Sequence, residues 1–414
     1  MTPPLRLLHK STALRAAVGF GLGGVGFALG NLLLARALPP AQFGVFTLFL
    51  ALVQMGASLA PIGLQGQVNR HPTRAVSLGR LLLTSVIVGV GVAGFAAAFY
   101  GMGTALVLAL LVSITAGGCT LVASSVFQSQ LRFAAALGLS QSFAIVLLVM
   151  GAAAVVVGGA PLWLLGALVA GQYLLLAIVG WGILGRPRAP GHEGGHSIWE
   201  GLSLLGITAA ALLLMQLERL LAPRLLTLED TARFAVAATL VGSPFRMLQM
   251  GAGYTLLPRL RAATSPQARR KLVRHEVLAV GLIGGAGGVT LLLAAPWIAD
   301  HLLAGKYVLS AGLMLAALVS GVAKLADAIA TTMVWSLASA RQLAMLNWAS
   351  WGCAVLGIAA GWLGARWGLL GLMYGVTAAW ICRGAVSGAL AATLLGAETA
   401  SGVIAPGAAA GVPG

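Results

Sequence analysis

Apolar residues run along this chain in long stretches, each separated from the next by a short segment with basic or turn-forming residues. A helix of about 20 apolar residues crosses the hydrocarbon core of a bilayer, which is roughly 30 Å thick. The pattern therefore predicts about twelve transmembrane helices. The first six are expected near residues 14–36, 42–66, 77–100, 103–130, 137–158 and 161–184. The second six are expected near residues 200–222, 232–257, 275–299, 307–335, 341–363 and 368–395.

Composition excludes a soluble protein. Of the 414 residues, 59% are apolar and only 8% are charged, and the mean hydropathy is +0.97. A soluble domain of this composition would expose large apolar patches and aggregate. We therefore predict an all-α, polytopic membrane protein.

The net charge of +16 is explained by membrane topology. Such an excess in a soluble protein would indicate a nucleic-acid partner, but here the basic residues fall mostly between the apolar stretches, so we expect no nucleic acid as partner. If the N-terminus is cytoplasmic, sixteen of the 25 Lys and Arg residues lie on the cytoplasmic side and six on the other side. This bias follows the positive-inside rule and predicts two cytoplasmic termini.

The two halves of the chain show a weak internal repeat. Leu34–Leu38 reads LARAL and Ala222–Leu226 reads APRLL, with a Phe ten residues after each Arg. Duplicated halves are typical of transporters. We expect a cytoplasmic N-terminus (1–13), an N-terminal six-helix lobe (14–185), a cytoplasmic linker (186–199), a C-terminal six-helix lobe (200–395) and a disordered cytoplasmic tail (396–414).

Two short motifs that elsewhere carry chemistry are interpreted as structural. Residues 21–26 match GxGxxG but lie within a predicted membrane helix, whereas a dinucleotide site needs a strand before the motif. Residues 192–196 match HExxH, yet Gly194 and Gly195 oppose the helix that would bring His192 and His196 together on one face. We predict neither a metal nor a cofactor.

Glycine is abundant, with 57 residues, and often recurs at intervals of four. Small residues at this spacing allow the backbones of membrane helices to approach closely. We expect this packing at Gly26/Gly30, Gly281/Gly285 and Gly357/Gly361.

Three basic residues lie inside predicted spans, where a charge costs about 2.5–3.5 kcal/mol and therefore usually faces a cavity or a partner. Arg246 follows Pro244 in the eighth span and has no acidic residue within one helical turn. Lys324 and Arg383 lie in the tenth and twelfth spans. Asp327 is three residues after Lys324, the spacing of an ion pair on one helix face.

The excess of buried positive charge indicates an anionic ligand, most simply one that bears phosphate. We predict that Arg246, Lys324 and Arg383 bind the substrate. Glu218, late in the seventh span, and Asp327 are the carboxylates available for coupling or for an ion pair.

Several stretches resemble a known family. Residues 32–70 (LLLARALPPAQFGVFTLFLALVQMGASLAPIGLQGQVNR) are similar to the opening of Wzx-like polysaccharide and oligosaccharide flippases of the multidrug/oligosaccharidyl-lipid/polysaccharide export superfamily. The segments 216–221 (QLERLL), 256–259 (LLPR) and 302–307 (LLAGKY) extend the similarity. Many relatives carry an acidic residue before the glycine near the end of the second span, where this chain has Pro61-Ile62-Gly63.

The resemblance implies two six-helix lobes around a central cavity, in the bacterial inner membrane. It implies a transporter that flips an undecaprenyl-diphosphate-linked oligosaccharide by alternating access. Arg246 would contact the diphosphate or an acidic sugar, and Lys324 and Arg383 would add positive field. The partners would be the lipid-linked glycan, membrane lipid, a polysaccharide polymerase and glycosyltransferases.

Three alternatives remain open. A small-molecule or drug exporter of the same superfamily would need acidic residues facing the cavity, and the chain has few. A membrane polymerase or ligase of lipid-linked glycans would need a substantial outer loop with polar catalytic residues, whereas the longest outer loop is expected near residues 223–233. A scaffold without transport activity is the third alternative. We expect a transporter and not an enzyme.

Overall fold

The structure is a computed structural model that describes residues 12–70, 76–130, 132–185, 198–263 and 265–400. These residues form twelve long helices, one short helix (α4) and two short helical turns (η1 and η2), with no strand in the described ranges. In chain order the elements are α2 (Thr12–Ala37), α3 (Pro40–Leu59), α4 (Leu64–Arg70), α5 (Leu78–Tyr100), α6 (Thr104–Ser129), α7 (Phe133–Val157), α8 (Leu162–Leu184), α9 (Ile198–Leu225), α10 (Leu228–Ala262), α11 (Pro266–Trp297), η1 (Ile298–Leu302), α12 (Ala311–Leu337), α13 (Ala340–Gly364), η2 (Ala365–Trp367) and α14 (Gly368–Ala400).

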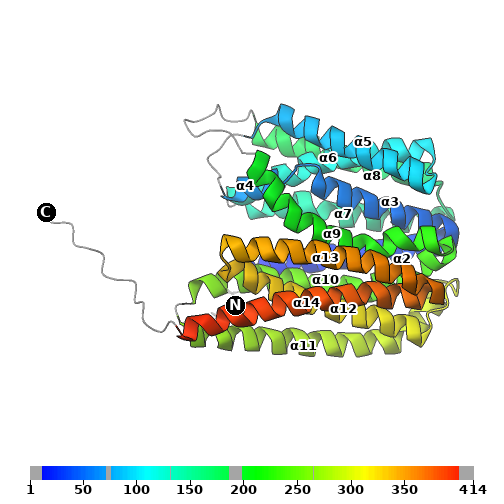
Figure 1. Cartoon of the computed structure of the whole chain (residues 1–414). Coiled ribbons are helices and arrows are strands. Elements are labelled where there is room, and N and C mark those ends of the chain that lie inside the picture. The colour runs from blue at the N-terminus through cyan, green and yellow to red at the C-terminus, as the bar shows by residue number, and fades with distance from the viewer. Residues whose placement is uncertain (1–11, 71–75, 131, 186–197, 264, 401–414) are drawn as a thin grey trace, which may run out of the picture.

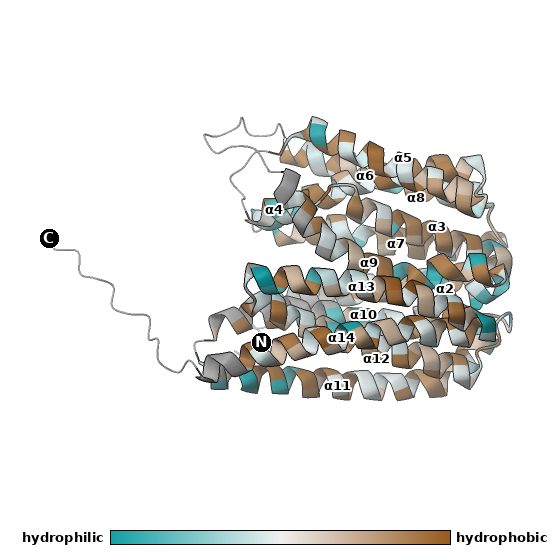
Figure 2. Ribbon diagram, in the orientation of Figure 1, coloured by the Kyte–Doolittle hydropathy of each residue, from teal (hydrophilic) through white to brown (hydrophobic). Residues whose placement is uncertain are grey.

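The all-α membrane architecture is confirmed. Within the described residues, eight segments are long and apolar enough to cross a membrane, and one of them contains both α13 and α14. With α2, α9 and α10, the number of long helices agrees with the expected twelve spans. In Figure 2, hydrophobic residues run along the helices while hydrophilic residues gather near the two ends of the bundle.

Some boundaries differ from the prediction. The second span, expected as one helix over 42–66, is broken, because α3 ends at Leu59 and the chain turns before α4. At this turn Ile62 and Gly63 both have positive φ angles (47° and 74°), a conformation that a helix cannot continue through. At the C-terminus, α14 continues to Ala400, five residues into the expected disordered tail. Most of the expected linker, with the HExxH motif, lies outside the described residues.

Equivalent helices pack together in the two halves of the chain. In the first half α2 packs on α7, and α6 packs on α3 and α8; in the second half α9 packs on α13, and α12 packs on α10 and α14. The halves meet where α2 contacts α10 and where α3 contacts both α9 and α10 (Figure 1). These contacts agree with the repeat in the sequence, and we propose the two halves as the two lobes.

The halves also touch near both ends of the bundle. Helix α2 begins and α14 ends at the same end of the bundle, because the chain crosses it an even number of times (Figure 1). We call this end the terminal end. At the terminal end, a Cβ on Gly63 would lie 2.1 Å from the backbone oxygen of Gly201, so the two backbones are in direct contact. Only glycine fits at such an approach.

At the opposite end, side chains from one half donate to backbone carbonyls of the other. The Tyr307 hydroxyl donates to the Ala35 oxygen (3.3 Å), and the Tyr100 hydroxyl donates to the Leu220 oxygen (2.8 Å). Burial raises the pKa of Tyr307, which lies in the loop before α12, so its hydroxyl stays protonated and able to donate. The Lys306 ammonium donates to the carbonyl of Arg36, in the last turn of α2.

Two of the three expected glycine contacts are present. Gly30 packs against the backbone of Leu147 on α7, and Gly357 packs against leucine side chains of α9. Gly281 and Gly285 on α11 have nothing within 4 Å of an added Cβ, so the packing expected there is wrong. The spacing alone does not tell which face of a helix meets a neighbour.

This difference predicts opposite effects of two matched substitutions. A Cβ on Gly30 would lie 2.6 Å from the backbone carbon of Leu147, so Gly30→Ala must push α2 away from α7. We expect a loss of about 1–3 kcal/mol, seen as a lower melting temperature of the purified protein. Gly285→Ala meets open space and gains helix propensity, so its melting temperature should be equal or slightly higher. Equal melting temperatures for the two variants would contradict the α2–α7 contact.

Candidate functional site

Six ionisable residues lie deep in the helices of the second half. They are Glu218 and Arg219 on α9, Arg246 on α10, Lys324 and Asp327 on α12, and Arg383 on α14. Because an unpaired charge is costly in hydrocarbon, the partner of each residue decides its role.

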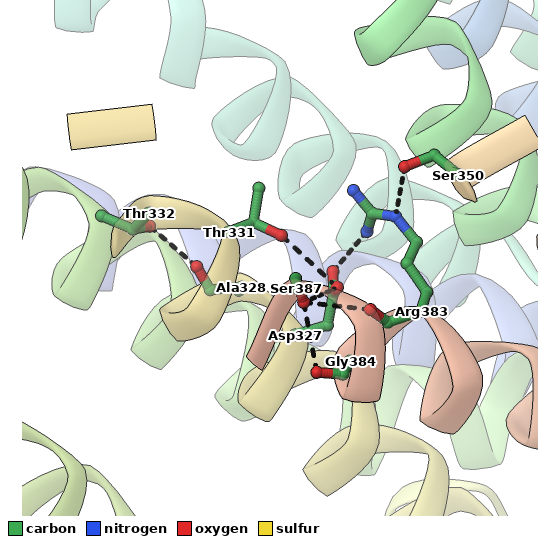
Figure 3. A network of polar contacts seen from close by, with 8 residues as sticks. All are labelled: Asp327, Ala328, Thr331, Thr332, Ser350, Arg383, Gly384 and Ser387. Atoms are coloured by element: carbon green, nitrogen blue, oxygen red, sulfur yellow. Dashed lines mark hydrogen bonds and ion pairs between the residues drawn. The ribbon is translucent and has the colours of Figure 1, made fainter. Parts of the chain in front are cut away.

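Asp327 and Arg383 form a buried ion pair between α12 and α14, shown in Figure 3. The Asp327 carboxylate also accepts hydrogen bonds from Ser387 (3.1 Å) and Thr331 (3.4 Å). The Nε of Arg383 donates to the Ser350 hydroxyl on α13 (3.2 Å). With this many partners both charges are satisfied inside the protein.

Glu218 and Lys324 form a second pair, between α9 and α12. The Lys324 Nζ lies 2.9 Å from Glu218 Oε1, and Ser320 lies 3.5 Å from the same oxygen. The ring of Trp380 lies close to both cations of the two pairs, with its centroid 5.7 Å from Lys324 Nζ and 5.5 Å from Arg383 Cζ. Such distances allow cation–π attraction.

These pairs correct the expectation of an ion pair between Lys324 and Asp327. The spacing of three residues permits that pair, but Lys324 binds Glu218 of α9 and Asp327 binds Arg383 of α14. The reason is tertiary: carboxylates and cations on neighbouring helices meet these side chains with better geometry than the local pair does. Lys324 and Arg383 are thus neutralised and do not supply the free positive field expected of them.

A cavity of about 370 Å³ adjoins both pairs, and we call it the α12–α14 cavity. Helices α9, α10, α12 and α14 line it with Ala211, Met215, Gln249, Lys324, Asp327, Ala328, Thr331, Thr332, Trp335, Trp380 and Arg383. Two of the three predicted binding residues therefore lie together.

Arg246 lies in a different cavity, of about 320 Å³, which we call the Arg246 cavity. It is formed by α2, α3, α6, α7 and α8 of the first half and by α10 of the second. Arg246 is exposed to this space, and none of the residues that line it is acidic. Within the described part of the chain, no carboxylate is paired with Arg246.

Arg219 was missed as a site residue, because its place late in the seventh span, next to Glu218, was interpreted as close to the outer face. In the structure it lies within α9, six residues before the end of the helix. Its guanidinium donates to Gln216 Oε1 (3.3 Å), and Gln216 donates to Gln54 of α3 (3.2 Å), which also lines the Arg246 cavity. Arg219 and Arg246 are close enough for their charges to repel. Gln54 and Gln216, two polar residues inside apolar helices, were the available signal.

The six charges leave a local excess of two positive charges. Glu218 and Asp327 balance Lys324 and Arg383, whereas Arg219 and Arg246 have no carboxylate of their own within the described ranges. Two neighbouring guanidinium groups without carboxylates favour an anion between or beside them. The site can therefore hold an anionic group, and no group of three or more potential metal ligands occurs among the described residues.

Comparison with known proteins supports the fold. No family model matches the chain, and no curated protein matches it. Among solved structures, it is similar to a multidrug resistance MATE family transporter of the MOP superfamily in an outward-facing conformation, with a TM-score of 0.52 and 11% identity over 94% of this chain and 95% of that one. A MATE structure in the bent conformation gives a TM-score of 0.51 and 14% identity over 97% of this chain and 99% of that one. The chain thus has a MATE-like fold.

The buried pair between Asp327 and Arg383 predicts strong coupling of two substitutions. Either Asp327→Leu or Arg383→Met alone leaves one charge buried without its partner, and we expect a loss of about 3–5 kcal/mol. The double variant removes both charges and should recover most of that loss. The measurement is the melting temperature of the four proteins in a double-mutant cycle. Additive effects of the two substitutions would show that the charges do not interact.

Proposed function

We propose that the protein is a transporter that moves an undecaprenyl-diphosphate-linked oligosaccharide across the bacterial inner membrane. The observation that carries this proposal is Arg246, a cation that lines a cavity between the two halves and has no carboxylate partner among the described residues, with Arg219 near enough to add its charge. The transporter-like fold supports it. Membership of the Wzx-like family is part of the proposal.

The chemistry of a diphosphate matches this pair. Guanidinium groups bind phosphate oxygens through two parallel hydrogen bonds, which gives both affinity and orientation. A diphosphate with two negative charges would balance the excess of Arg219 and Arg246. Charge balance in turn lowers the cost of moving the headgroup through the membrane.

The Arg246 cavity also provides uncharged polar groups for a hydrated headgroup. The lining residues include hydroxyl and amide side chains from the first half, namely Gln54, Ser58, Thr120, Ser124, Ser140 and Gln141. They hydrogen-bond water or sugar hydroxyls without adding charge. The lipid tail would stay in the bilayer while the headgroup passes between the halves.

Alternating access requires that the contacts at the two ends break in turn. The backbone contact of Gly63 with Gly201 joins the halves at the terminal end, and the Tyr307 and Lys306 hydrogen bonds join them at the opposite end. Rocking of one half against the other would break the contacts at one end while the contacts at the other end remain formed.

The alternative is an exporter of small cationic drugs, since one similar structure is described as a multidrug resistance transporter. Such a substrate needs free carboxylates in the cavity. Glu218 and Asp327 are each bound to a cation of the protein, so the geometry favours the anionic substrate.

Charge removal at Arg246 tests the proposal. Purified protein in liposomes is given a fluorescent polyprenyl-diphosphate disaccharide, and its movement between leaflets is followed with a quencher that cannot cross the membrane. Arg246→Gln should slow this movement by about tenfold or more, because a charged hydrogen bond is worth about 1.5–3 kcal/mol. Arg366→Gln removes an exposed charge from η2 and should leave the rate unchanged. Equal rates for Arg246→Gln and the unaltered protein, or movement of ethidium instead of the lipid, would overturn the proposal.

The proposed orientation is tested by reporter fusions. With both termini cytoplasmic, green fluorescent protein fused after Gly414 should fluoresce. Alkaline phosphatase fused after Lys306, in the loop before α12, should be active because that loop faces the periplasm. Activity with the opposite pattern would show that the membrane orientation is inverted.

A further inference from the structure

The α12–α14 cavity has walls with charged groups but no net charge. Lys324, Asp327 and Arg383 line it, and each belongs to one of the two ion pairs described above. The partner of Lys324 is Glu218, which is buried behind the lining. A free cation or anion would gain little here, because each wall charge is already neutralised by the protein. The cavity therefore suits a ligand that is polar and uncharged.

Hydrogen-bonding groups are nevertheless available in this cavity. The Gln249 amide has no hydrogen-bond partner among the residues that the structure describes. The Lys324 ammonium gives one bond to Glu218 and has further N–H groups, and 20% of its side chain is exposed. The hydroxyls of Thr331 and Thr332 each donate inside the protein and keep lone pairs that accept.

The cavity also has an aromatic wall. Trp335 is 47% exposed and Trp380 is buried, and both line the cavity. An indole ring combines a large apolar face with one polar N–H group. A sugar ring complements such a wall, because it has an apolar face of C–H groups that can stack on the indole and hydroxyl groups around its edge that can form hydrogen bonds.

Position links this cavity to the Arg246 cavity. Gln249 follows Arg246 by three residues on α10, which is less than one helical turn. On α9, Met215 lines the α12–α14 cavity, while the next residue, Gln216, is bonded to Arg219. The two cavities thus adjoin the same stretches of α9 and α10.

We propose that the α12–α14 cavity binds a neutral sugar of the lipid-linked glycan while Arg219 and Arg246 hold its diphosphate. The inference rests on the proposed function and assigns its sugar site. A sugar ring stacks on Trp335, and its hydroxyls bond to Gln249, Lys324 and the threonines. The volume of about 370 Å³ lies within the range of small-molecule pockets, roughly 300–1,000 Å³, and accommodates a mono- or disaccharide.

The test compares two probes of equal charge that differ in the sugar. Affinities of the purified full-length protein are measured for the methyl ester of polyprenyl diphosphate and for polyprenyl diphosphate linked to one N-acetylglucosamine, each of which carries two negative charges. The unaltered protein should bind the sugar-bearing probe about tenfold more tightly, as expected for one stacked ring and one or two hydrogen bonds. Trp335→Ala and Gln249→Leu should lose this preference but keep the affinity for the methyl ester of polyprenyl diphosphate.

Controls separate the sugar site from folding and from the proposed function. Trp335→Phe keeps an aromatic ring and should retain most of the preference, and Trp348→Ala removes a 77% exposed ring of α13 outside the cavity and should retain all of it. Equal binding of the two probes, or a preference that survives Trp335→Ala and Gln249→Leu, would overturn the sugar site alone. Binding of neither probe would overturn the proposed function as well.

Discussion

The cost of burying charge in a membrane organises the second half of this protein. A charge in the bilayer is tolerated when a partner or a polar cavity compensates it. Glu218, Lys324, Asp327 and Arg383 satisfy this condition among themselves, in two pairs that join α9 to α12 and α12 to α14. Arg219 and Arg246 do not, and their positions define where a ligand of opposite charge would be most stabilised.

Helices α9 and α10 connect the two kinds of charge. Glu218 and Arg219 are neighbours in the sequence, yet Glu218 faces α12 while Arg219 bonds towards α3. The ion pair of Glu218 with Lys324 thus holds α9 to the second half, and the hydrogen bond between Gln216 and Gln54 connects it to the first half. A relative movement of the halves would change the surroundings of Arg219 and Arg246 but leave the paired charges intact. A ligand that binds the two arginines would therefore respond to the relative position of the two halves.

The sequence predicts the membrane helices well because hydropathy acts over about 20 residues and depends little on the partners of a helix. It also indicated that Arg246 lacks a local acidic partner, since an arginine with no acid nearby is visible without a structure, and its role in binding stays a prediction. It failed where a partner lies on another helix: the pair of Lys324 with Asp327 was wrong for that reason. Arg219 was missed because a charge near the end of a span is normally interpreted as facing the membrane surface, and its contacts towards Gln54 of α3 depend on the tertiary structure. The break at Ile62 and Gly63 depends on backbone angles that hydropathy does not report.

The central claim is that Arg219 and Arg246 together form the anionic site. It is tested most directly by a cryo-electron microscopy map of the protein bound to a polyprenyl diphosphate. We predict density for both phosphates against the two guanidinium groups, at the junction of α9, α10 and α3. A map with the diphosphate elsewhere, and with a carboxylate of the protein bound to Arg246, would contradict it.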